Sequence, residues 1–287
     1  MKIPPYWARG RYEGKDRKGI EHTFFSIGWS FDSLQQARAE ASAKAKRIFE
    51  FITAGRKPER YEYHNRPIRE EILKEIHDGD ALIAVITRNR YGALVLNCSN
   101  ALFVDVDFPR SQPVGLLAGL LQAFSRKRSQ DGVQATVHAT IQAVEQWAER
   151  NPDRSFRLYR TKEGLRLLFT DRLYEPASAE TAVTLSELKA DPLYVMLTRK
   201  QECFRARLTS KPWRCGSPRP PNAFPWDHPE AEAAFRKWEN AYTMQDAKFK
   251  ICELIRTFGS PADIRSLQTI VELHDRGARI HADADLA

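Results

Sequence analysis

The order of the elements predicted between residues 102 and 208 constrains the fold more than any other feature of the chain. Alternating apolar side chains and apolar residues at helical spacing predict, in order, strand 102–108, helical region 114–150, strands 155–161 and 165–170, helix 178–189 and strand 201–208. The order β-α-β-β-α-β is that of a ferredoxin-like or RRM-like unit, an antiparallel sheet with helices on one face. In this unit the strands would lie in the order fourth, first, third, second, with strand 102–108 inside the sheet.

Both flanks of this unit carry further predicted elements. Before it lie a hairpin over 6–12 and 22–29, a helix ending near 53, a short helix over 67–77 and strands over 82–87 and 93–96. After it come an aperiodic, ordered loop over 209–228 and helices over 229–242, 247–258 and 264–276. The sequence therefore predicts an α+β fold with an N-terminal α/β unit at 1–80, an RRM-like palm at 81–215 and a loop and helical region at 216–287.

Composition limits the location and the partners of the chain. No apolar run approaches the roughly 20 residues that cross a bilayer, and the N-terminus lacks the apolar segment of a secretory signal. The four cysteines show no CxxC spacing, which favours a reducing compartment, so a cytoplasmic protein without membrane contact is expected. The net charge of +8 favours an anionic partner.

Asp105 and Asp107 are the first candidate site residues. They lie two residues apart in strand 102–108, so they point to one face of the sheet while Val104 and Val106 point to the other. Two adjacent carboxylates repel each other unless a divalent metal or arginines neutralise them. The pair is therefore predicted to be a metal site for Mg²⁺ or Mn²⁺, or one half of an ion-pair network.

The same alternation places several cations on the face that carries the two aspartates. Phe156, Leu158, Leu165, Leu167 and Phe169 would face the core, as would Phe204, Ala206 and Leu208. The opposite, open face would then carry Arg157, Tyr159, Arg166, Arg205 and Arg207. Metal-binding carboxylates beside arginines suit phosphate chemistry, because Mg²⁺ recruits substrate phosphates and guanidinium groups bind them in pairs of hydrogen bonds.

These segments resemble the primase-polymerase (archaeo-eukaryotic primase) superfamily. Asp105-Val106-Asp107 matches its Asp-x-Asp strand, 161–169 is similar to its glycine-containing strand turn, and 203–211 is similar to its late basic strand. The resemblance covers roughly residues 80–215. It implies an RRM-like catalytic palm and Mg²⁺- or Mn²⁺-dependent nucleotidyl transfer, with Asp105 and Asp107 as catalytic metal ligands. It also implies that Arg166, Arg205, Arg207 and Lys211 bind nucleotide phosphates.

The chain departs from the family pattern at two places. Arg166 stands where the family has a histidine, and an arginine binds phosphate but does not titrate near neutral pH. The third acidic metal ligand has no clear counterpart; Glu163, Asp171 and Glu202 are the candidates.

Other residues are predicted to contact nucleic acid. They share a cationic or aromatic side chain near the same strands: Arg88, Arg90, Arg157, Tyr159, Trp213 and Arg214. For Trp213 and Trp226, packing of the loop against the body of the protein is the alternative. Cys203, Cys215 and His228 match no zinc spacing, and buried structural cysteines are expected instead.

Three functions remain open on the sequence. The first is a nucleotidyltransferase of primase-polymerase type that acts on a nucleoside triphosphate and single-stranded or primed nucleic acid. The second is a catalytically inactive nucleotide- or nucleic-acid-binding module of the same fold, which would bind single strands in a salt-sensitive way. The third is a partner-binding protein whose aspartates and arginines only pair with one another.

Overall fold

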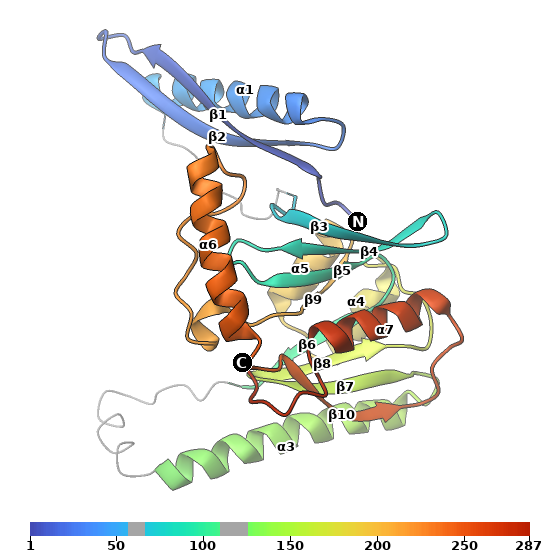
Figure 1. Ribbon diagram of the computed structural model, residues 1–287. Coiled ribbons are helices and arrows are strands. Elements are labelled where there is room, and N and C mark those ends of the chain that lie inside the picture. Colours follow the sequence, from blue (N-terminus) through green and yellow to red (C-terminus); the bar gives the residue numbers. More distant parts are fainter. Residues whose placement is uncertain (57–66, 110–125) are drawn as a thin grey trace.

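The computed structural model describes residues 1–56, 67–109 and 126–287. Within these ranges the chain is α+β, as predicted, with three antiparallel sheets and six α-helices stacked from the N-terminal hairpin to the long helix α3 (Figure 1). The first part of the predicted helical region, 114–125, lies outside the described residues. None of the described helices combines the length and the apolar character that crossing a bilayer requires.

The N-terminal hairpin and its helix form as predicted. The elements are β1 (Tyr6–Lys15), β2 (Glu21–Ser30) and α1 (Leu34–Thr53). Ser33 caps α1 by accepting a hydrogen bond from the Gln36 backbone N–H, and Ala37 and Ala41 lie on its buried face. A Cβ on Gly28 would lie 2.3 Å from the Ala37 carbonyl oxygen, so glycine is needed for this close helix–hairpin contact.

A second sheet has the strand order β3-β4-β5-β9. Its strands are β3 (Glu71–Asp78), β4 (Ala81–Arg88), β5 (Leu94–Cys98) and β9 (Phe204–Arg207). The predicted helix over 67–77 is therefore wrong. Ile72 and Ile76 have helical spacing, but the segment pairs with β4, where Ile76 lies opposite Ala84. Tertiary pairing here overrides a weak local preference. This pairing also crosses the predicted domain boundary at residue 80.

The third sheet has the order β10-β7-β8-β6. Its strands are β6 (Phe103–Asp107), β7 (Phe156–Thr161), β8 (Gly164–Phe169) and β10 (Cys252–Phe258). The predicted neighbours β6, β8 and β7 are confirmed. The predicted fourth strand is wrong, because β9 pairs with β5 and leaves β6 at one end of the sheet. The helix predicted over 247–258 is also wrong, since β10 pairs antiparallel with β7.

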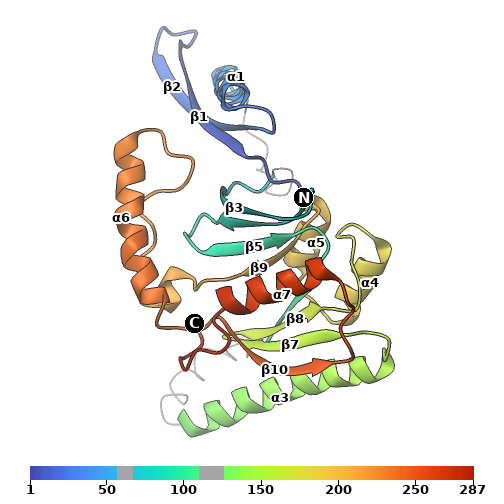
Figure 2. The same cartoon turned by 45° about the vertical axis from the view of Figure 1, so that its right-hand side comes forward.

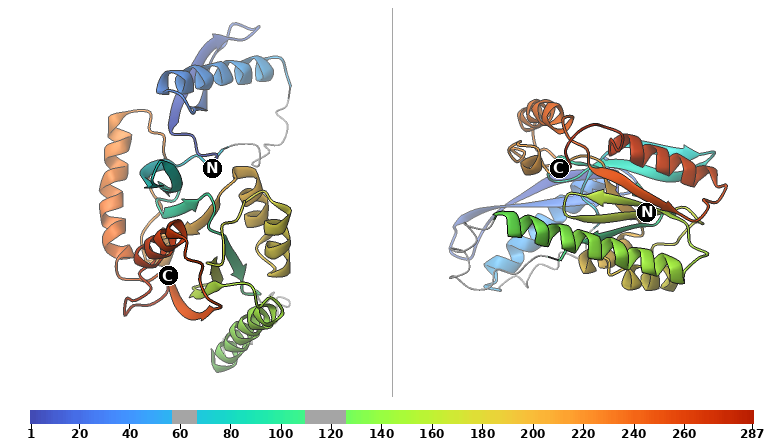
Figure 3. Two further views of the ribbon diagram at one scale, coloured as in Figure 1. Left: turned by 90° about the vertical axis from the view of Figure 1, so that its right-hand side faces the viewer. Right: turned by 90° about the horizontal axis from the view of Figure 1, so that it is seen from below.

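Helices cover both faces of the third sheet (Figures 1 and 2). On one face lies α3 (Arg126–Arg150), in front of the sheet in the view from below in Figure 3, and its Trp147 packs against Phe156 and Phe169. On the other face lies α7 (Arg265–Gly277), whose His274 packs against Phe103 and Tyr159. The face that the sequence predicts to be open is therefore covered by α7.

Three further helices flank the sheets. They are α4 (Ala179–Glu187), α5 (Pro192–Gln201), which was not predicted, and α6 (Pro229–Asp246). In the left view of Figure 3, α6 lies on the opposite side of the molecule from α4 and α5. The loop before α6 is ordered, as predicted, and contains a short 3₁₀ helix at Pro212–Arg214.

Candidate functional site

Asp105 is held by a buried arginine. Asp105 lies opposite Arg166 in the β6–β8 register, and the Arg166 Nε and Nη2 atoms donate to its two carboxylate oxygens over 2.8 and 3.2 Å. Only 2% of the Arg166 side chain is exposed, compared with 34% of the Asp105 side chain. Burial alone would lower the pKa of Arg166, but the attraction of Asp105 and its hydrogen bonds raise it. The pair is therefore a bidentate ion pair that gives the buried Arg166 its counter-charge.

Asp107 lies at the exposed end of the same strand. It stands opposite Gly164, and a Cβ there would come within 2.2 Å of the Val106 carbonyl oxygen. Glycine thus lets the turn between β7 and β8 approach β6, and the Phe108 N–H donates to the Glu163 carbonyl oxygen over 2.9 Å. Of the three candidates for a third acidic ligand, Glu163 is the one near Asp107.

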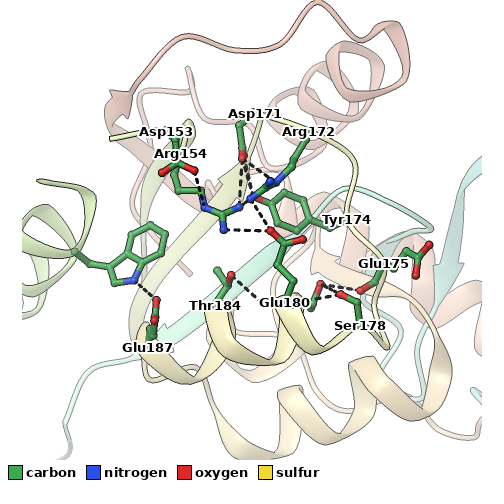
Figure 4. Close-up of polar contacts among 12 residues, drawn as sticks. Asp153, Arg154, Asp171, Arg172, Tyr174, Glu175, Ser178, Glu180, Thr184 and Glu187 are labelled. Atoms are coloured by element: carbon green, nitrogen blue, oxygen red, sulfur yellow. Dashed lines mark hydrogen bonds and ion pairs between the residues drawn. The ribbon is translucent and has the colours of Figure 1, made fainter. Parts of the chain in front are cut away.

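The other two candidates are engaged elsewhere. Glu202 forms an ion pair with Lys2. Asp171 lies beyond the opposite end of β8, where it accepts from the Tyr174 hydroxyl over 2.8 Å and lies 3.7 Å from Arg154 (Figure 4). Burial raises the pKa of Asp171. This polar cluster ties the segment after β8 to the start of α4, because Arg154 and Arg172 both pair with Glu180. Its geometry assigns it a structural role.

Among the described residues, no group of three or more histidine, cysteine, aspartate or glutamate side chains could hold a metal ion. Both oxygens of Asp105 are directed at Arg166. A divalent ion at Asp105 would therefore have to share these oxygens with the positive charge of the guanidinium group, which repels it. The described side chains thus do not fit the predicted Mg²⁺ or Mn²⁺ site.

Several predicted contact residues have acidic partners within the protein. Arg205 donates to both carboxylate oxygens of Glu70, over 2.6 and 2.7 Å. Arg157 and Tyr159 both donate to Asp275 of α7, over 2.8 and 2.7 Å. Arg88 is buried between Glu71 of β3 and Glu239 of α6, and these two ion pairs join α6 to the second sheet. The prediction that Arg157, Tyr159 and Arg205 line an open face is therefore wrong, and Arg88 is enclosed as well.

A cluster of cations lies where β9 ends. It contains Arg207, Lys211 and Arg214, and Arg214 pairs with Glu163. No hydrogen bond reaches the buried Nε of Arg207. Burial, and next the nearby Arg166, lower the pKa of Arg207 to about 10. Burial and the charges of Arg207 and Arg214 also lower the pKa of Lys211. Positive charge therefore exceeds nearby negative charge at this place, which favours a bound anion.

Cations and aromatic rings form a surface next to this cluster. We call it the basic-aromatic surface, made of Arg90, Tyr91, Lys211, Trp213 and Arg219. The Tyr91 and Trp213 rings meet edge to face with centroids 5.2 Å apart, and Arg90 lies 4.6 Å from the Tyr91 ring. Lys211 and Arg219 lie 5.8 and 5.4 Å from the Trp213 ring. Trp213 is 46% exposed, so the loop does not bury it.

Local hydrogen bonds shape the two segments that carry this surface. The Asn89 side chain accepts from the backbone N–H groups of Tyr91 and Ala93, which fixes the turn between β4 and β5. Trp213 lies in the 3₁₀ helix after β9, whose last residue, Arg214, donates its N–H to the Lys211 carbonyl oxygen. The sequence predicts Arg90, Lys211 and Trp213 as contacts but misses Tyr91 and Arg219. Each of the missed residues lies beside a predicted contact or in the same basic loop.

The cysteines carry no reactive site. All four are buried, as expected, and His228 caps α6 at the surface. Cys252, His274 and Asp275 lie in a row that resembles a nucleophile with its base, with Cys252 Sγ 3.9 Å from His274 Nε2 and His274 Nδ1 3.0 Å from Asp275 Oδ1. Both Cys252 and His274 are inaccessible, and burial raises the pKa of the Cys252 thiol to about 12.

Among the described residues, the basic-aromatic surface and the Arg207 cluster combine an excess of cations with side chains that solvent reaches, which suits an anionic ligand. The resemblance to primase-polymerases rests on short segments, and an Asp-x-Asp string such as Asp105-Val106-Asp107 has low specificity by itself. No protein-family model matches the chain, and no curated protein or solved structure shows significant similarity to it.

Proposed function

We propose that the protein binds single-stranded nucleic acid through the basic-aromatic surface. The observation that carries this proposal is the contact of two accessible rings, Tyr91 and Trp213, with three cations from two loops. Bases of a single strand stack on aromatic rings, and cations beside the rings bind the phosphates. Binding of this kind requires no catalytic carboxylates, so the engagement of Asp105 by Arg166 does not oppose it.

The cation cluster beneath the surface supports a phosphate-containing ligand. No hydrogen bond reaches the buried Nε of Arg207, and after burial the charge of Arg207 is the main cause that lowers the pKa of Lys211. A phosphate near them would relieve this repulsion and accept hydrogen bonds from both side chains. The net charge of +8 adds long-range attraction for a polyanion.

Binding to a fluorescent single strand of about 16 nucleotides tests the proposal by anisotropy. We expect wild-type affinity to fall steeply between about 50 and 200 mM salt, because phosphate contacts release counterions. Trp213→Ala should weaken binding roughly 5- to 100-fold, since it removes a stacking ring. Arg219→Ala should lower the salt slope by about one unit.

Matched control variants keep this experiment specific. Phe25→Ala removes an exposed aromatic ring outside the surface, and Arg265→Ala removes an exposed arginine from the start of α7. Both should bind as the wild type does. Wild-type binding that is absent at low salt, or insensitive to salt, would refute the proposed function.

Metal-dependent nucleotidyl transfer is the second candidate. The observation in its favour is the exposed Asp107, which lies on the same strand face as Asp105. Its charge acts on nearby Lys211 and opposes the lowering of the Lys211 pKa. A primase-like palm would need the ordered strand pairing of an RRM-like sheet, whereas here β9 pairs with β5. The Asp105–Arg166 pair also suits the alternative of a partner-binding protein with a structural Asp/Arg network.

Two measurements distinguish nucleic-acid binding from nucleotidyl transfer. They are calorimetric titration with Mn²⁺ and incorporation of a labelled nucleoside triphosphate into a primed strand. If nucleic-acid binding alone is the function, Mn²⁺ should bind wild type and Asp107→Asn equally weakly, and neither should extend the primer. Primer extension that requires Mn²⁺ and is lost in Asp107→Asn would establish nucleotidyl transfer instead. Asp107 is the residue of choice because it is exposed, so its replacement should leave the fold intact.

A further inference from the structure

A cleft of about 610 Å³ lies between the N-terminal hairpin and the second sheet. Its walls come from β1, β2 and α1, from the segment before β3, from the turn between β4 and β5, and from α5 and β9. Figure 2 shows the hairpin above β3, with α5 behind the same sheet. The volume is within the range of sites that hold a ligand of nucleotide size.

The charged residues of the cleft favour an anionic occupant. Four cations and one acid line it: Lys44, Arg69, Arg90, Arg205 and Glu70. Glu70 is already bound by Arg205, and it also accepts from the Thr87 hydroxyl over 2.5 Å. The acid is thereby neutralised within the protein. Arg205 is neutralised in the same pair, and Lys44 and Arg69 have contacts of their own, so the charge that attracts a phosphate group here is chiefly that of Arg90, which also belongs to the basic-aromatic surface.

The remaining walls suit bases. Trp7, Trp29 and Tyr91 line the cleft together with aliphatic side chains such as Leu193 and Leu197. Trp7 is fixed by its indole N–H, which donates to the Pro4 carbonyl oxygen over 2.9 Å. Trp29 is 37% exposed and lies opposite Trp7 in the hairpin. Trp7 is only 7% exposed, so Trp29 and Tyr91 are the rings on which bases could stack beside the cations of the cleft.

Two residues belong both to the cleft and to the basic-aromatic surface. Arg90 and Tyr91 line the cleft, and Tyr91 contacts the Trp213 ring on the other side. We propose that a single strand bound on the basic-aromatic surface continues past Arg90 and Tyr91 into this cleft, so that the N-terminal hairpin extends the binding site. This inference rests on the proposed function. It adds that the bound length, and hence the affinity for longer strands, depends on the hairpin.

Strands of two lengths test the path. With a strand of about 16 nucleotides, Trp29→Ala should weaken binding roughly 5- to 100-fold, because a stacking ring in the cleft is lost. With a strand of about 5 nucleotides, which the basic-aromatic surface alone can hold, Trp29→Ala should bind as the wild type does. Trp213→Ala should weaken binding of both lengths.

Two variants that place opposite charges at Leu193, a residue that lines the cleft, give a second, independent test. Leu193 is 50% exposed on α5, so replacements there should fold. Leu193→Glu should weaken binding of the longer strand by at least about threefold, whereas Leu193→Lys should maintain or strengthen it. Phe25→Ala, on the same hairpin face as Trp29 but outside the cleft, is the matched aromatic control and should leave both affinities unchanged.

The outcomes distinguish this inference from the proposed function. If Trp213→Ala weakens both lengths but Trp29→Ala and Leu193→Glu weaken neither, the cleft is not on the path although the surface binds nucleic acid. Equal losses from Phe25→Ala and Trp29→Ala would place the strand along the whole hairpin and overturn the cleft. A change of oligomeric state in Trp29→Ala, seen by light scattering, would make the cleft an interface between copies and would also overturn it. Wild-type protein that binds neither strand refutes the proposed function itself.

Discussion

Replacement of Asp105 by alanine is expected to lower the free energy of unfolding by about 3–5 kcal/mol. The reason is Arg166, which is only 2% exposed and directs two hydrogen bonds at the Asp105 carboxylate. Without that carboxylate, a guanidinium group stays buried with one remaining acceptor, the Arg207 carbonyl oxygen at 3.0 Å. Urea denaturation followed by tryptophan fluorescence measures the change, with the midpoint and the slope fitted separately.

Two comparison variants separate an ion pair from other effects of the substitution. Asp107→Ala, on the same face of β6 but exposed, should lower the free energy of unfolding by no more than about 1 kcal/mol, the usual limit for an exposed ion pair. The double variant Asp105→Ala with Arg166→Leu should recover much of the lost stability, because it removes the unpaired charge together with its partner. Equal stabilities of Asp105→Ala and wild type would mean that Arg166 does not depend on Asp105.

This expectation also bears on what the Asp-x-Asp strand does. Catalytic carboxylates that hold a metal repel each other in the empty protein, so their replacement usually maintains or raises stability. The contacts of Asp105 predict the reverse. A large loss of stability in Asp105→Ala, with at most a small one in Asp107→Ala, would therefore identify Asp105 as a structural ion-pair residue.

Local patterns predicted the parts of the fold that depend on neighbours in the sequence. The hairpin β1–β2, helix α1 and the adjacent strands β6, β8 and β7 follow from alternation, caps and short turns. The errors concern non-local pairing. Strand β9 was recognised, but its choice of β5 over β6 depends on residues about a hundred positions away. The segments of β3 and β10 have mixed patterns, and their partners β4 and β7 decide their conformation.

The prediction of the candidate site was incomplete for the same reason, because local patterns do not show which distant elements pack together. Alternation correctly put Asp105, Arg166 and Tyr159 on one face of the sheet. It could not reveal that α7 covers this face, because the docking of a helix depends on the whole tertiary arrangement. The acids that pair with Arg157 and Arg205 lie on α7 and just before β3. Trp213 and Lys211 were found because a basic loop rich in aromatic residues is already visible in the sequence.

The packing of α7 has a further consequence, a loss of stability on the acid side of pH 6.5. His274 is fully buried between Cys252, Asp275 and the rings of Phe103 and Tyr159. Burial lowers the pKa of His274, the nearby charge of Arg166 lowers it further, and the hydrogen bond with Asp275 offsets only part of this. The folded protein therefore keeps the ring neutral at pH values where the unfolded chain takes up a proton.

The sign of the effect follows from proton linkage. Above about pH 6.5 the ring is neutral in both states and contributes no pH dependence. Below this value the unfolded state binds more protons, so the free energy of unfolding falls by up to about 1.4 kcal/mol per pH unit until the folded pKa is reached. Burial raises the pKa of Asp275, but the hydrogen bonds of His274 and Tyr159 and the charge of Arg157 lower it overall. Protonation of Asp275 therefore causes a second loss of stability only below about pH 3.8.

Denaturation by urea at pH 7.5 and pH 4.5 measures this loss in the wild type and in His274→Asn. The variant will be less stable at pH 7.5, because it disturbs a packed position, but its difference in stability between the two pH values should be smaller than that of the wild type. His77→Asn, which removes a half-exposed histidine of β3, should retain the wild-type difference. If His274→Asn and wild type lose the same stability on acidification, another group is responsible and α7 packs without a titrating contact. A reduced difference would establish that the helix covering Asp105 and Arg166 is held by a histidine that must stay neutral.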